Sequence, residues 1–173
     1  MRIPHARVPS LASELLRAMV AGKAIEVDAA DRHEAEADIA SVLAEYLRQE
    51  REVTELAKET LDRRGLGPEN LNRARKLAAQ ERGLAIDDEA SAYIMDQIIE
   101  TLMQSKNVSE VFGEDHDLKR LMKPVFVRQA AQDVEVDEEA RKRIKNMTEG
   151  TASWEVEYKK ALAAIRRARG LND

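Results

Sequence analysis

Apolar residues recur at three- and four-residue spacings over six stretches of the chain, which is the pattern of amphipathic α-helices. Leu11, Leu15 and Met19 form one such stripe, and Ile94, Ile98 and Leu102 form another. Glycine or proline separates neighbouring stretches, as expected where helices end and turn. The pattern predicts helices over residues 10–21, 30–64, 68–82, 88–104, 115–147 and 151–169.

Two of these helices are unusually long. In the helix over residues 30–64 the apolar stripe is thin, because residues 48–52 read RQERE and must be largely solvated. A long helix with a thin stripe is typical of an arm of an antiparallel hairpin. In the helix over residues 115–147, Pro124 predicts a kink or a break.

The two halves of the chain resemble each other. Residues 15–25 (LLRAMVAGKAI) and 98–108 (IIETLMQSKNV) match at their apolar positions, and Val53, Ala57 and Leu61 match Val136, Ala140 and Ile144. Any two amphipathic helices share some matches, but here the loop positions agree as well. We therefore predict an all-α fold, an elongated helical bundle or set of hairpins built from two similar three-helix halves. The halves are residues 1–87 and 88–173, which can pack as one domain, and residues 10–64 should superpose on 93–147.

The composition agrees with an all-α chain. Ala, Leu, Glu, Arg and Lys dominate, and aromatic residues are only 3% of the 173 residues. The absence of cysteine excludes disulfides, thiolate metal sites and cysteine nucleophiles. No apolar run approaches the roughly 18 residues of a membrane span, and the first residues do not form a signal peptide. These features favour a cytoplasmic protein with no membrane partner.

Three segments carry a family resemblance: MRIP at residues 1–4, VPSLA at residues 8–12 and EGTASWEVEYKK at residues 149–160. With them, the chain resembles the bacterial domain of unknown function five-hundred-seven family over essentially its whole length, in a two-copy form. The first copy departs from the pattern, because Pro68-Glu69-Asn70-Leu71 stands where the second has Trp154. The resemblance implies a bacterial, cytoplasmic, helical protein and no established activity.

No motif of catalysis or cofactor binding is present. Gly65-Leu66-Gly67 lacks the third glycine and the preceding strand of a phosphate-binding loop. His33 and Glu36 are one helical turn apart and could offer two metal ligands, but acidic residues also favour a helix N-terminus for electrostatic reasons. We therefore predict no catalytic, cofactor-binding or metal-ligating residue, and no cofactor.

Trp154 and Tyr158 are one turn apart on the last predicted helix. This spacing favours an aromatic anchor in the core over an exposed anchor for a partner, although both interpretations are open.

Charge is unevenly distributed, although the net charge is only −5. Residues 26–62 hold twelve acidic and four basic residues, whereas residues 159–169 hold five basic residues and no acid. The basic third helices could lie against the acidic long helices, which we favour, or could bind RNA or ribosomal phosphates. The possible nucleic-acid contacts are Arg73, Arg75, Lys76, Arg166, Arg167 and Arg169.

Together these observations predict a non-enzymatic helical interaction module that binds another macromolecule, either a protein partner or a second copy in a homodimer. The first alternative is an RNA- or ribosome-associated protein that uses the basic third helices. A metal-dependent enzyme is the second alternative.

Overall fold

The structure, a computed structural model, describes residues 3–148 and 151–170. Met1, Arg2, Glu149 and Gly150, which belong to the segments that carry the family resemblance, lie outside these residues. The described chain is all-α apart from one minimal ladder, as predicted. Its elements are η1 (His5–Arg7), α1 (Val8–Ala21), β1 (Ile25–Glu26), α2 (Arg32–Arg64), η2 (Pro68–Asn70), α3 (Leu71–Glu81), η3 (Asp87–Glu89), α4 (Ala90–Gln104), β2 (Glu110–Val111), α5 (Asp115–Arg143) and α6 (Ala152–Ala168).

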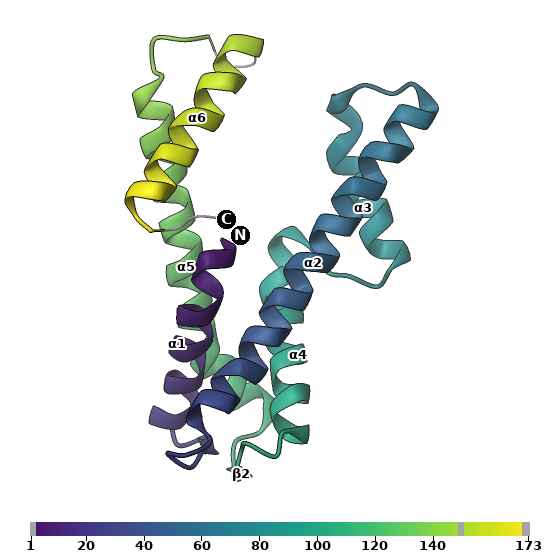
Figure 1. Cartoon of the computed structure of the whole chain (residues 1–173). Helices are drawn as coiled ribbons and strands as arrows, with labels where there is room; N and C mark the ends of the chain where they lie inside the picture. Colours follow the sequence, from purple (N-terminus) through teal and green to yellow (C-terminus); the bar gives the residue numbers. More distant parts are fainter. Residues whose placement is uncertain (1–2, 149–150, 171–173) are drawn as a thin grey trace.

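The molecule has the shape of a V (Figure 1). Its base contains α1, α4 and the N-terminal halves of α2 and α5. The C-terminal half of α2 rises from the base with α3 as the first arm, residues 50–84, and the C-terminal half of α5 rises with α6 as the second arm, residues 130–170. With 33 residues, α2 is about 50 Å long, so it extends well beyond the base.

One apolar core fills the base and takes residues from both predicted halves. The stripes of α1 and α2 meet those of α4 and α5 there, and each fully buried Leu or Ile contributes about 1.5–3 kcal/mol. The largest fully buried side chains of the base are Leu11, Leu15, Leu16, Met19, Ile39, Leu43, Ile94, Ile98, Leu102, Leu118 and Met122. Because this core is shared, the boundary between residues 87 and 88 does not separate two independent cores.

A short antiparallel ladder closes the end of the base, where β1 pairs with β2 in the register Ile25 to Val111 and Glu26 to Glu110. The carbonyl of Ala24 accepts hydrogen bonds from the N–H groups of Phe112 and Gly113. A Cβ at Gly113 would lie 3.0 Å from the Cβ of Ala24, so the close approach of these loops favours glycine. Two-residue strands give no alternating pattern, and the sequence did not predict them.

Of the predicted kink or break at Pro124, the break is absent, because α5 runs without interruption from Asp115 to Arg143, whereas the kink stays a prediction. Proline removes one backbone hydrogen bond from a helix. On either side of it, however, Met122, Val125 and Phe126 are buried in the core of the base, and their packing holds the helix together.

The order of elements is the same in both halves: a short helix, a strand, a long helix and a third helix. This order agrees with the predicted duplication, which stays a prediction until residues 10–64 are superposed on 93–147. None of the helices in the described ranges combines the length and the apolarity that a membrane crossing requires.

Candidate interaction surfaces

The first arm carries a groove between α2 and α3 with a volume of about 390 Å³. Leu56 and Leu61 of α2 line one wall, and Ala74 and Leu77 of α3 line the other. Leu66, in the turn between the helices, closes one end. Leu66 is 46% exposed and Leu77 is 53% exposed, so the groove presents apolar side chains to solvent.

The turn that forms this groove follows from local chemistry. Gly65 ends α2 in the left-handed conformation, with φ of 62°, and Gly67-Pro68 then starts the next helical turn. The short connection folds α3 back along α2 and brings Leu66 beside the groove.

Some basic side chains in and next to α3 form ion pairs with acidic side chains of α2. The guanidinium of Arg75 lies 3.3 Å from Glu50 and 3.8 Å from Asp87, and it donates to the hydroxyl of Thr54. Arg82 donates to Glu52 over 2.9 Å. These contacts agree with the interpretation that the third helices offset the charge of the long helices.

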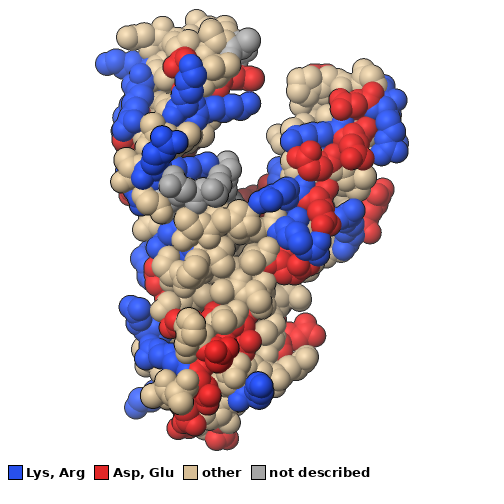
Figure 2. All heavy atoms as spheres, viewed as in Figure 1, with Lys and Arg blue, Asp and Glu red and all other residues tan. Residues whose placement is uncertain are grey.

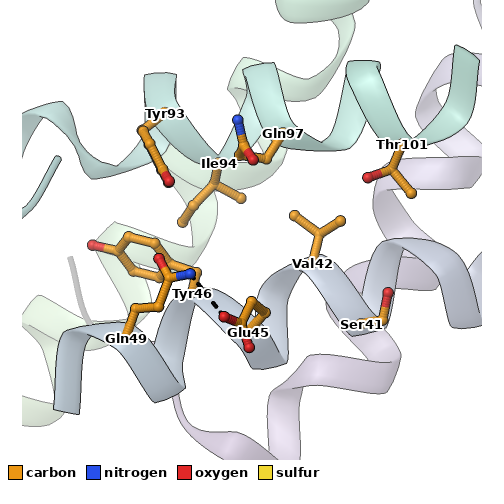
Figure 3. Close-up of a pocket in the computed structure, with 9 residues that line it drawn as sticks. All are labelled: Ser41, Val42, Glu45, Tyr46, Gln49, Tyr93, Ile94, Gln97 and Thr101. Atoms are coloured by element: carbon orange, nitrogen blue, oxygen red, sulfur yellow. Dashed lines mark hydrogen bonds between the residues drawn. The ribbon is translucent and has the colours of Figure 1, made fainter. Parts of the chain in front are cut away.

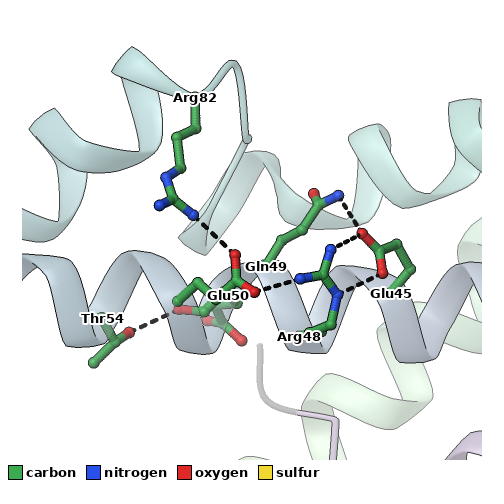
Figure 4. A network of polar contacts seen from close by, with 7 residues as sticks. Glu45, Arg48, Gln49, Glu50, Thr54 and Arg82 are labelled. Atoms are coloured by element: carbon green, nitrogen blue, oxygen red, sulfur yellow. Dashed lines mark hydrogen bonds and ion pairs between the residues drawn. The ribbon is translucent and has the colours of Figure 1, made fainter.

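Figure 4 shows how this network continues along α2. Arg48 donates to both carboxylate oxygens of Glu45 and also pairs with Glu52, while Gln49 donates to Glu45. The hydrogen bond from Arg48, followed by that from Gln49, lowers the pKa of Glu45 to about 2. The segment predicted to be solvated is therefore a row of surface ion pairs.

Arg73 and Lys76 differ from Arg75. In the described part of the chain neither has a carboxylate within 4.0 Å, and both are exposed or half-exposed on α3, where Arg73 lines the groove beside Leu77. The sequence analysis grouped Arg73, Arg75 and Lys76 as possible nucleic-acid contacts. In the fold, Arg75 forms ion pairs, whereas the other two side chains face solvent.

The second arm shows the same division. Arg166 lies 3.9 Å from Asp133, and Arg169 pairs with Glu135 at 3.7 Å and with Glu139 at 2.9 Å. Arg167 has no carboxylate within 4.0 Å among residues 3–148 and 151–170. Figure 2 shows Lys and Arg side chains gathered on the second arm. On the first arm, across the gap of the V, basic and acidic side chains are mixed.

Trp154 and Tyr158 stack on the second arm with ring centroids 4.8 Å apart and an interplanar angle of 7°. The guanidinium of Arg141 lies 5.6 Å from each centroid, a cation–π arrangement. Both rings are half-buried, and Tyr158 packs against the buried cluster of Val136, Ala140 and Ile165. Trp154 is in the first turn of α6. Tyr158 thus extends this cluster, and Trp154 stacks on Tyr158.

The hydroxyl of Tyr158 donates to Asp137 of α5. Partial burial, and then this hydrogen bond, raise the pKa of Tyr158 to about 12. The same bond, with that from Arg141, lowers the pKa of Asp137. This contact joins α6 to α5 as the arginine pairs do.

A second hollow, of about 240 Å³, lies between α2 and α4 (Figure 3). Glu45 and Gln49 of α2 face Gln97 and Thr101 of α4 across it. Tyr46 closes the inner end, where its hydroxyl donates to the carbonyl of Ala85. Burial raises the pKa of Tyr46 well above its ordinary value. Sequence analysis missed this hollow, because its residues alternate with core positions and form no motif.

The histidine segments are placed on the surface. His33 is exposed in the first turn of α2, and Glu36 accepts from Ser13 and pairs with Arg32 at 3.8 Å. Within the described ranges, no three His, Asp or Glu side chains are grouped to hold a metal ion.

Comparison with known proteins gives one result. A family model described as "Protein of unknown function (DUF507)" matches residues 1–171. The chain belongs to the DUF507 family. This match confirms the resemblance seen in the sequence, and it assigns the DUF507 family no activity. A search of curated proteins finds no match.

Proposed function

We propose that the chain is a non-enzymatic interaction module that binds a helical segment of another protein in the groove of the first arm. The observation that carries the proposal is the exposure of Leu66 and Leu77 at 46% and 53% beside a preformed groove. A helix with apolar residues at three- and four-residue spacings fits such a groove. Burial of the exposed part of each leucine contributes about 1 kcal/mol.

The charge at the groove suggests the composition of the partner. Arg64 and Arg73 line it, and in the described residues neither has a carboxylate within 4.0 Å. Glu81 is the acidic residue of the lining. A partner helix with acidic residues beside its apolar stripe would complement this arrangement.

We also propose that the chain has no catalytic activity of its own. The side chains that meet in its grooves are apolar groups, amides, hydroxyls and charged groups, which suit recognition. Turnover of any compound in an unbiased metabolite screen with purified protein would contradict this proposal.

The experiment is affinity capture from native lysate with and without nuclease, followed by mass spectrometry. Three baits are compared: the wild type, the double variant Leu66→Asp/Leu77→Asp, and the control Val156→Asp, whose valine is 51% exposed on α6. We expect a protein partner that survives nuclease, stays with the control and is lost with the double variant. A partner retained by the double variant would contradict the assignment to the first arm.

An RNA- or ribosome-associated role is the second candidate, supported by Arg73, Lys76 and Arg167, which have no carboxylate within 4.0 Å in the described chain. It predicts association that weakens steeply between about 50 and 200 mM salt, because phosphate contacts release counterions. Loss of recovery on nuclease treatment would favour this candidate over the first.

A further inference from the structure

The solvent side of α5 carries an apolar stripe that is separate from the groove of the first arm. The C-terminal member of the stripe, Val134, borders a hollow of about 400 Å³ between α5 and α6. Pro124, Val127, Ala131 and Val134 follow one another at steps of three, four and three residues, so they lie on one face of the helix. All four are exposed, Val127 at 58% and Val134 at 57%. Single exposed valines are ordinary, whereas four apolar residues with heptad spacing form a seam of the kind that two helices share.

The seam lies on the side of α5 opposite its buried residues, with Pro124 and Val127 bordering α4 and Val134 bordering α6. The buried residues of α5, such as Met122, Val125 and Val136, lie on the opposite side of the helix, where they contact the base and α6. The seam is therefore outside the buried core, and its N-terminal half adjoins the core residue Met95 across the groove between α4 and α5.

Opposite charges flank the two ends of the seam. Lys123 and Arg128 lie beside its N-terminal half, and Glu135 and Glu138 lie beside its C-terminal half. Arg128 is 61% exposed and pairs with Glu14 at 3.9 Å. Glu135 is 67% exposed and pairs with Arg169 at 3.7 Å. Such exposed pairs are weak, so these charges can also serve a second contact.

We propose that α5 pairs antiparallel with α5 of a second copy of this chain, about a twofold axis near Ala131. Val127 then faces Val134 of the second copy, and the small side chain of Ala131 lets the helices approach closely at the axis. Arg128 faces Glu135 of the second copy, and Lys123 faces Glu138. A parallel pairing would instead place like charges opposite each other.

A groove of about 1010 Å³ between α4 and α5 borders the seam and widens the contact. Met95 and Ala92 of α4 give it an apolar wall. Lys119, Arg120 and Lys123 stand on its rim with Asp88 as the acidic residue, a local excess of positive charge in a chain of net charge −5. In the antiparallel arrangement the acidic half of the second α5 lies beside this basic rim.

The first test measures mass against concentration by sedimentation velocity. The wild type should approach twice its 19.5 kDa chain mass as concentration rises. Val127→Asp and Val134→Asp should each weaken the dimer at least tenfold, while the matched control Val156→Asp should leave it unchanged. A wild type that stays monomeric at every concentration would overturn the proposal, as would equal effects of all three variants.

Charge exchange tests the register and uses variants on the exposed surface. Arg128→Glu alone and Glu135→Arg alone each place like charges at both ends of the homodimer, so each should be largely monomeric. An equal mixture of the two variants should form a heterodimer, because every flanking pair is then complementary. A mixture that stays monomeric while the wild type dimerises would reject this register.

The absence of cysteine allows a third, direct test. Ala131→Cys should form a disulfide-linked dimer on mild oxidation, because the two copies of this position meet at the axis. Ala163→Cys, exposed on α6, is the control and should remain a reduced monomer. Comparable cross-linking of the two variants would overturn the position of the axis.

Discussion

At the scale of single residues, the pair of Tyr158 and Asp137 is the most specific contact of the second arm. Partial burial and the hydrogen bond to Asp137 hold Tyr158 protonated to a pH of about 12. Its stabilising effect is complete below the ordinary pKa of 10 and is lost as pH rises towards 12. The pKa of Asp137 is lowered, so its own contribution is present above about pH 4 and is lost on acidification below that value.

An absorbance titration of tyrosinate tests this pair. We expect one transition near pH 12 that disappears in Tyr158→Phe. In Asp137→Asn the same transition should move towards pH 10, because the carboxylate that disfavours tyrosinate is gone. A transition that Asp137→Asn leaves in place would show that Asp137 does not contribute to the shift.

A second comparison separates core leucines from groove leucines. Leu43 is fully buried in the base, so Leu43→Ala should lower the free energy of unfolding by about 2–5 kcal/mol. Leu77→Ala should change it by no more than about 0.5 kcal/mol, because that side chain is 53% exposed. Urea denaturation followed by circular dichroism measures both, and a large loss for Leu77→Ala would mean that the groove is structural.

At the scale of residues, the sequence did not predict which basic side chains form ion pairs. The charge pattern predicted basic third helices, but it did not separate Arg75, Arg166 and Arg169, which form ion pairs, from Arg73, Lys76 and Arg167. That separation depends on which side of a short helix faces its neighbour, and here charges occur around most of its circumference. Trp154 is half-buried for a similar reason: its spacing to Tyr158 fixes their stacking, whereas burial depends on how far α6 overlaps α5.

At the scale of elements, the two arms are not equally supported. Val53, Ala78 and Leu84 of the first arm belong to the core of the base. The second arm has a separate cluster whose buried members are Val136, Ala140 and Ile165. So small a cluster gives α6 little packing free energy beyond its ion pairs.

We therefore expect Ile165→Ala to release α6 while the base stays folded. Hydrogen exchange should show loss of protection over residues 152–168 and unchanged protection over α1 and α4. The matched substitution Ala163→Gly, at an exposed position of α6, should lower protection only slightly. Global unfolding of Ile165→Ala would show that the second arm is part of the main cooperative unit.

The helices were largely predictable from the chain. Their apolar stripes and the glycines at their ends placed all six long elements within a few residues, because packing follows the stripe and glycine permits the turn. The ladder of Ile25 with Val111 was not predictable, since it joins segments far apart in sequence with two residues each. The exposed seam of α5 was hidden because Val127 and Val134 look like core residues until the opposite face is shown to be buried.

At the scale of the whole molecule, the two predicted halves complete each other. α1 contacts α5, and α2 contacts α4, so part of the apolar stripe of each half is covered by the other half. We expect residues 1–87 and residues 88–173 to be poorly helical when expressed separately and to regain helicity when mixed. Circular dichroism measures this, and a cooperative thermal transition in either fragment alone would contradict it.

In the V shape the far end of the first arm projects from the base, and the central claim is that this arm is a surface for a protein partner. Site-specific photo-crosslinking in the source cells tests that claim most directly, with the crosslinking amino acid at Leu77 and, as control, at exposed Arg63 of α2, outside the groove. The account predicts a discrete, nuclease-resistant protein adduct at Leu77 and none at Arg63. Equal adducts at both positions, or an adduct of RNA at Leu77, would contradict it.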